Sequence, residues 1–102
     1  MVIGSNDICI FACFDKDRHS GEMHLKMLRD ALDYLHENVP RALVNLVLMP
    51  DILALHRIAK KPNICELTHI VECPCMFGAN AASKIEFANK TLEDYRRVER
   101  EL

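Results

Sequence analysis

The sequence predicts an α/β layered fold, because strand-like and helix-like stretches alternate along it. Residues 42–49 (ALVNLVLM) are an almost continuous apolar run, which is typical of a parallel strand covered on both faces. Residues 20–39 and 83–102 instead carry apolar side chains at intervals of three and four, as amphipathic helices do. No repeat, low-complexity stretch or linker divides the 102 residues, so we predict a single unit.

The first half of the chain is expected to run strand, loop, helix. Residues 1–3 are apolar and stop at Gly4, as the end of a buried strand would. Residues 5–20 carry Asn, Asp, Ser and two cysteines without a sustained period, which indicates a loop. Ser20 can cap the helix that follows, and Pro40 lies beyond its end because proline has no amide hydrogen to donate.

The second half is expected to run strand, helix, cysteine-bearing loop, helix. After the apolar run, residues 50–61 are predicted as a short helix and residues 62–78 as a loop. Ser83 fits a capping box with Glu86, and the apolar stripe of the last helix continues to Leu102. A sheet of two parallel strands would leave both edges unpaired and bury little core, so we expect it to dock onto further protein.

Composition excludes several classes of protein. Thirteen Lys and Arg against 15 Asp and Glu leave a net charge of −2, which argues against a nucleic-acid-binding protein. A hydrophobic content of 50% with 27% charged residues is ordinary for a globular chain and argues against disorder. No apolar run reaches the length of a membrane span, and no signal peptide is expected at the N-terminus.

Residues 4–7 (GSND) lie where the first predicted strand gives way to a loop, the place where α/β sheets carry their reacting residues. Gly4 permits a sharp turn and the close approach of a substrate. Asn6 carries a side-chain amide that can donate a hydrogen bond to a developing negative charge. On these residues alone, an ordinary turn is the alternative interpretation.

The surrounding residues resemble a family of hydrolases. Residues 2–9 (VIGSNDIC) resemble the third sequence block of the GDSL, or SGNH, hydrolases, a hydrophobic strand followed by Gly-x-Asn-Asp. Further stretches are similar to the phospholipase B branch of that family: the cysteines after this block, residues 31–36, 39–42 and 44–47, and Cys73-Pro74-Cys75 ahead of Ile85-Glu86-Phe87. The resemblance implies a fragment of a flavodoxin-like three-layer α/β/α sandwich with parallel strands.

The resemblance also implies a function. Members of the family hydrolyse carboxylic esters, here those of glycerophospholipids, through a serine acyl-enzyme. Asn6 would be one donor of the oxyanion hole, with Gly4 shaping its turn. The chain has no Gly-Asp-Ser block, and its Asp33-Tyr34-Leu35-His36 lies in a predicted helix, away from the family's Asp-x-x-His position. Residues 1–102 are therefore expected to be part of an SGNH domain that is inactive alone; a catalytically dead paralogue is an alternative.

The implied partners and location follow from the same resemblance. A phospholipid or lipid ester is the expected substrate, the missing parts of the same domain are expected partners, and no cofactor is expected. The intact enzyme would be secreted or membrane-associated outside the cell. Asn89-Lys90-Thr91 is a glycosylation sequon, which fits a secretory chain.

Cysteine content leaves two interpretations open. The five cysteines are Cys9, Cys13, Cys65, Cys73 and Cys75. The resemblance to a secreted family favours disulfides among them, with the connectivity undetermined and at least one thiol left over. The alternative is a small Cys/His-rich binding module stabilised by zinc or by disulfides, and the zinc ligands would be Cys65, His69, Cys73 and Cys75.

Overall fold

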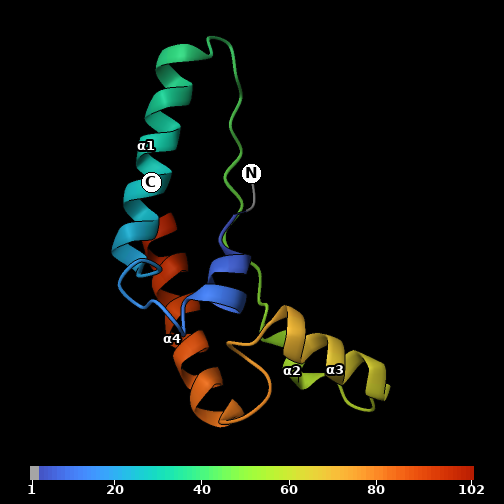
Figure 1. Cartoon of the computed structure of the whole chain (residues 1–102). Coiled ribbons are helices and arrows are strands. Elements are labelled where there is room, and N and C mark those ends of the chain that lie inside the picture. Colours follow the sequence, from blue (N-terminus) through green and yellow to red (C-terminus); the bar gives the residue numbers. More distant parts are fainter. Residues whose placement is uncertain (1–2) are drawn as a thin grey trace.

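The computed structural model describes residues 3–102, which fold into helices joined by loops and one long extended segment (Figure 1). The elements in chain order are the π-helix η1 (Asp7–Phe11) and the α-helices α1 (Gly21–Asn38), α2 (Ala54–Arg57), α3 (Asn63–Glu72) and α4 (Ala81–Glu99). Helices α1 and α4 pack against each other, and η1 packs against α4. Helices α2 and α3 lie together to one side of this group.

The predicted α/β sandwich with parallel strands is wrong, because residues 3–102 contain no strand and no sheet. Residues 42–49, expected as a buried strand, run extended beside α1 with no partner strand among residues 3–102, and Leu43 is 98% exposed (Figure 1). An apolar run favours burial, but a strand also needs a neighbouring strand for its N–H and C=O groups. The other predicted strand falls mainly on residues 1 and 2, which lie outside the described residues.

Both stretches predicted as loops contain helices. Residues 5–20 include η1, and residues 62–78 include α3, while the short helix predicted over residues 50–61 is reduced to α2. Cys9 lies in η1 and Cys73 follows the last residue of α3, and the two are joined by a disulfide. This disulfide holds η1 beside the end of α3, a contact that the weak local periodicity does not predict.

The two long helices are predicted correctly, with one error at a boundary. Ser20 caps α1, since its Oγ accepts a hydrogen bond from the Met23 amide at 3.3 Å. The same helix ends before Pro40, as expected. Helix α4 begins earlier than the predicted capping box, so that Ser83 lies inside it and its hydroxyl donates to the Asn80 carbonyl at 3.0 Å.

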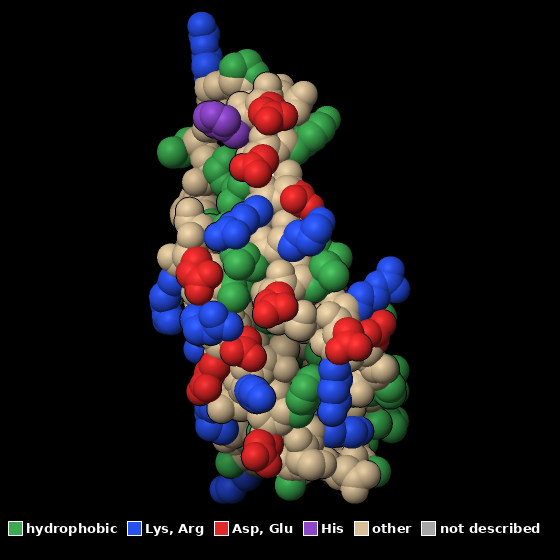
Figure 2. Space-filling view, turned by 90° about the vertical axis from the view of Figure 1, so that its left-hand side faces the viewer, with side chains coloured by type: hydrophobic (Ala, Val, Ile, Leu, Met, Phe, Trp, Pro, Cys, Tyr) green, Lys and Arg blue, Asp and Glu red, His purple; other side chains and the backbone are tan. Residues whose placement is uncertain are grey.

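The core lies where α4 meets η1 and the segments around Met49 and Met76. Its buried side chains include Ile8, Met49, Leu53, Met76, Ala88, Leu92 and Tyr95. The members on α4 recur at intervals of three and four, so they form the single apolar stripe that the sequence predicts. The outer face of α1 instead shows interspersed acidic and basic side chains (Figure 2).

Two disulfides join η1 and the loop after it to the segment that follows α3. Cys9 is bonded to Cys73 across 64 residues of chain, and Cys13 to Cys75 across 62. The prediction of disulfides is thereby confirmed. Closing a loop of this length restricts the unfolded chain, which stabilises the folded state by about 4 kcal/mol. Cys65, on α3, is a free cysteine and is half-buried.

Candidate functional site

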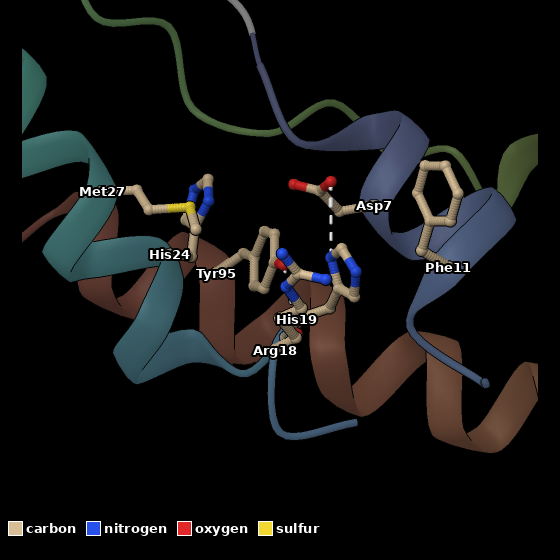
Figure 3. Close-up of a pocket in the computed structure, with 7 residues that line it drawn as sticks. All are labelled: Asp7, Phe11, Arg18, His19, His24, Met27 and Tyr95. Carbon is tan, nitrogen blue, oxygen red and sulfur yellow. Dashed lines mark hydrogen bonds and ion pairs between the residues drawn. The ribbon is translucent and has the colours of Figure 1, made fainter. Parts of the chain in front are cut away.

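A pocket of about 350 Å³ opens between η1, the loop that follows it, α1 and α4 (Figure 3). Its lining combines charged, aromatic and thioether side chains from all four segments. These are Asp7 and Phe11 from η1, Arg18 and His19 from the loop, His24 and Met27 from α1, and Tyr95 from α4. The pocket lies directly after the Gly-Ser-Asn-Asp turn, so it is the candidate site nearest to the predicted functional residues.

His19 is held in the pocket from three directions. Its Nδ1 lies 3.4 Å from the Asp7 Oδ1, and the two side chains face each other in Figure 3. Its ring stacks on Phe11, with 5.5 Å between the ring centroids. The Tyr95 hydroxyl donates a hydrogen bond to the backbone carbonyl of His19 at 3.1 Å. The loop residue is therefore fixed against both η1 and α4.

His24, which lines the pocket, forms a buried pair with Glu99. The His24 Nε2 lies 3.0 Å from the Glu99 Oε1, and their side chains are only 5% and 1% exposed. The other carboxylate oxygen of Glu99 accepts the Met49 amide at 2.8 Å, while the Arg96 Nε donates to the Met49 carbonyl at 2.7 Å. Helix α4 thus binds both polar backbone groups of one residue, which anchors the end of the extended segment.

Tyr95 connects these two clusters and stays protonated. Its ring stacks on His24, with centroids 3.9 Å apart and planes inclined by 9°. Burial raises the pKa of the Tyr95 hydroxyl, and the carboxylates of Asp7 and Glu99 raise it further because they oppose a second negative charge nearby. The hydroxyl therefore serves as a hydrogen-bond donor in this site and not as a base.

Gly4 lies buried against this aromatic pair. Its φ is +109°, a conformation that residues with a Cβ rarely adopt. A Cβ at this position would collide with the Met49 methyl group and would lie 3.1 Å from His24 Cε1 and 3.2 Å from Tyr95 Cε2. Glycine is therefore required here by packing as well as by backbone conformation, whereas its role in shaping an oxyanion hole stays a prediction.

Asn6 precedes η1 and is exposed. Its side chain makes no capping hydrogen bond to the helix, and it does not line the pocket, although the adjacent Asp7 does. Its role as an oxyanion donor stays a prediction.

Sequence reasoning misses most of the residues that line the pocket. From the sequence, His19 and His24 are interpreted as solvated, because no second ligand lies at a suitable spacing from them, and Arg18 is interpreted as part of a solvated mixed-charge loop. His24 alone carries a usable signal, since it lies four residues before Leu28 and so falls on the apolar stripe of the predicted helix.

The residues of the zinc alternative do not form a metal site. The sulfurs of Cys73 and Cys75 are engaged in disulfides, and the His69 ring packs against Phe77 with 4.8 Å between centroids. In the part of the chain that the structure describes, no group of three or more His, Cys, Asp and Glu side chains is arranged to hold a metal ion. Asn89 is exposed on α4, and its use as a glycosylation site stays a prediction.

Comparisons with known proteins connect the chain to one enzyme. It is 30% identical to mouse membrane-associated phospholipase B1 over an alignment of 103 positions that covers 98% of this chain. The rat protein of that name is 42% identical over 79 residues (74% of this chain), and the human one 36% identical over 100 residues (91% of this chain). The chain is related to a short segment of a phospholipase. It spans only 5–7% of the length of these relatives.

The other comparisons add no family or fold. No family model matches the chain, and no solved structure matches it significantly. The relatives are named as membrane-associated. Within residues 3–102, none of the helices has the length and apolar content needed to cross a bilayer.

Proposed function

We propose that this chain takes part in the hydrolysis of glycerophospholipid esters, as the oxyanion-hole segment of a phospholipase of the GDSL/SGNH hydrolase family. The observation that carries the proposal is the similarity to phospholipase B1, which extends over 98% of the chain in the mouse protein. The Gly4-Ser5-Asn6-Asp7 turn supports it, because it matches the Gly-x-Asn-Asp pattern of that hydrolase family.

Asn6 is the residue that would act on the substrate. Its side chain is exposed and is not engaged in capping η1, so its amide hydrogens are available to a bound ester. When a nucleophile attacks the ester carbonyl, the oxygen gains negative charge, and a positioned amide N–H stabilises that charge. Removal of one such donor costs about 3–4 kcal/mol of transition-state stabilisation.

The nucleophile and the base would come from other parts of the enzyme. The 102 residues contain no Gly-Asp-Ser block. Asp33 and His36, which spell the family's Asp-x-x-His, both lie exposed on α1. Without a serine and a histidine in contact, no acyl-enzyme forms, so this chain alone should not hydrolyse esters. We expect mapping of the transcript beyond both ends to reveal a Gly-Asp-Ser block upstream and an Asp-x-x-His downstream.

A chimaera tests the role of Asn6. The segment of mouse phospholipase B1 that aligns with this chain is replaced by it, and release of fatty acid from phosphatidylcholine is measured. We expect the Asn6→Ala variant of the active chimaera to lose activity by about 10²–10³-fold in kcat. Asn63→Ala, at the exposed first residue of α3, is the matched control and should retain full activity. An Asn6→Ala chimaera with unchanged kcat would refute the oxyanion role.

We also propose a secretory location for the chain. Two disulfides support it, because such bonds persist in oxidising compartments. The relatives are described as membrane-associated, which also supports it. Expression through a secretory pathway should add one glycan at Asn89, read as a mass loss after enzymatic deglycosylation. Thr91→Ala destroys the sequon and should abolish this mass change, whereas Thr68→Ala, exposed on α3, should not.

A further inference from the structure

The pocket beside η1 presents charges of opposite sign to the same space. The Arg18 guanidinium lines it and, within residues 3–102, has no hydrogen-bond or ion-pair partner. The Asp7 carboxylate lines it too, and its only ion-pair contact within those residues is the long one to His19 at 3.4 Å. The pocket therefore contains a cationic side chain without an ion-pair partner and an anionic side chain with one long ion-pair contact, within residues 3–102.

The rest of the lining is apolar and accessible. Phe11 and Met27 are 48% and 57% exposed, although both line the pocket. The Tyr95 ring closes the pocket from α4 and contributes a neutral hydroxyl that is already bonded to the His19 carbonyl. The other polar side chains of the pocket are those of Asp7, Arg18 and the two histidines, with aromatic surface between them.

These features discriminate between ligand classes. A simple anion that binds Arg18 would be repelled by Asp7, and a simple cation that binds Asp7 would be repelled by Arg18. An uncharged apolar ligand would remove both charges from water without compensation. A zwitterion satisfies both. A phosphate suits the planar guanidinium, and an alkylated ammonium suits a carboxylate beside aromatic rings.

We propose that this pocket binds a phosphocholine-type zwitterion, with Arg18 on the phosphate and Asp7 and Phe11 on the quaternary ammonium. The proposal goes beyond the hydrolytic role of the chain, because it involves neither Asn6 nor an ester carbonyl. The same phosphate and quaternary ammonium groups exist in a lipid headgroup and in a free phosphocholine ester; only the lipid source rests on the proposed function.

Binding to the oxidised 102-residue chain tests the proposal. Phosphocholine, choline and inorganic phosphate are titrated separately and followed by NMR shifts of the pocket residues. Phosphocholine should bind about tenfold or more tightly than either half alone, because it satisfies both charges. Arg18→Gln should weaken phosphocholine and phosphate about tenfold while sparing choline, and Asp7→Asn should weaken phosphocholine and choline while sparing phosphate.

Matched controls separate the pocket from general charge effects. Arg29→Gln and Asp33→Asn change exposed charges on α1 and should leave all three affinities unchanged. Asn6→Ala should also leave them unchanged, so that a failure of the oxyanion role is distinguishable from a failure here. Phosphate that binds as tightly as phosphocholine, a control that weakens binding as much as Arg18→Gln, or no binding of phosphocholine would overturn the proposal.

Vesicles identify the source of the zwitterion. Binding to phosphatidylcholine vesicles but not to phosphatidylglycerol vesicles, lost in Arg18→Gln, would support the pocket and assign a lipid headgroup. Binding to soluble phosphocholine without vesicle binding would support the pocket and assign a free phosphocholine ester. Stronger binding to phosphatidylglycerol would contradict it, since an anionic surface offers no ammonium to Asp7.

Discussion

Two regions of this molecule contain similar apolar residues but bury them to very different extents. The packed region comprises η1, the first turns of α1, Met49 and α4, and its core side chains, such as Ile8, Met49 and Tyr95, are only 1% exposed. The open region comprises residues 42–48 and α3, where Leu43 and Val71 are 98% and 73% exposed. In the packed region, side chains of α4 bind the backbone of the extended segment at Met49, and disulfides hold η1 in place. Apolar sequence alone therefore does not bury a segment.

The largest effect should come from removal of the disulfides, which would leave the packed region as unconstrained as the open one. Reduction of both bonds is expected to lower the free energy of unfolding by about 4 kcal/mol, with little extra from the second, because the two bonds close nearly the same loop. Urea denaturation with and without reductant measures the difference. Cys65→Ser in the oxidised protein is the control and should change stability by less than about 0.5 kcal/mol.

A smaller loss of stability is expected when the buried His24–Glu99 pair is broken. Glu99→Leu leaves the Met49 amide without an acceptor and His24 without its partner, which should cost about 3 kcal/mol. The control is Glu101→Leu, whose exposed carboxylate forms an ion pair with Arg97, and it should cost less than about 1 kcal/mol. Equal losses in the two variants would show that the packed region does not depend on this pair.

Two glycines sharpen the comparison, because both have positive φ but only one lies in the packed region. Gly4→Ala should cost about 2 kcal/mol, from backbone strain together with contacts to Met49 and Tyr95. Gly78→Ala should cost about 1 kcal/mol, since its φ is +88° but the nearest atom to a Cβ, on Ile70, is 3.7 Å away. Thermal or urea unfolding measures the loss of stability in each variant, and the difference between the two losses is the contribution of close packing at Gly4.

The smallest effect concerns the response to alkaline pH. The pKa of Tyr95 is raised in the folded state, so the folded protein keeps a proton that the unfolded chain releases once the pH exceeds about 10. The corresponding stability is therefore complete below pH 10 and declines above it, by about 1.4 kcal/mol per pH unit at most. Tyr95→Phe should remove this decline in urea midpoints measured from pH 8 to 11, at a cost of about 1 kcal/mol at neutral pH. Tyr34→Phe, at an exposed position, should retain it.

The parts of the fold that are predictable are those determined by local sequence. Helices α1 and α4 follow from capping and from apolar spacing within one segment, and both are present close to their predicted bounds. The disulfides follow from the resemblance and the cysteine count, although the sequence leaves their pairing open. The predicted strand over residues 42–49 is wrong because strand formation depends on a partner elsewhere in the chain, which the apolar run does not reveal.

The pocket is the least predictable part of the molecule. Asp7 and Tyr95 are far apart in sequence, and they line the same cavity only because η1 packs on α4. Arg18 and His19 sit in a mixed-charge stretch with no period, so nothing local distinguishes them from solvated residues. The predicted turn at residues 4–7 indicates the correct neighbourhood, since Gly4 contacts the His24 and Tyr95 rings and Asp7 lines the pocket.

The disulfides Cys9–Cys73 and Cys13–Cys75 close two overlapping loops of chain, and residues 14–72 lie inside both. A protease that cuts the exposed backbone near Lys60, outside the packed region, would therefore leave both products linked. On an electrophoresis gel, such a nicked protein would migrate as one species until a thiol is added. Cleavage between Phe77 and Ala81 would instead release α4 from the rest of the chain, and with it the anchor of Met49. A cut inside the disulfide-closed loops thus leaves the products covalently linked, whereas a cut after Cys75 separates them.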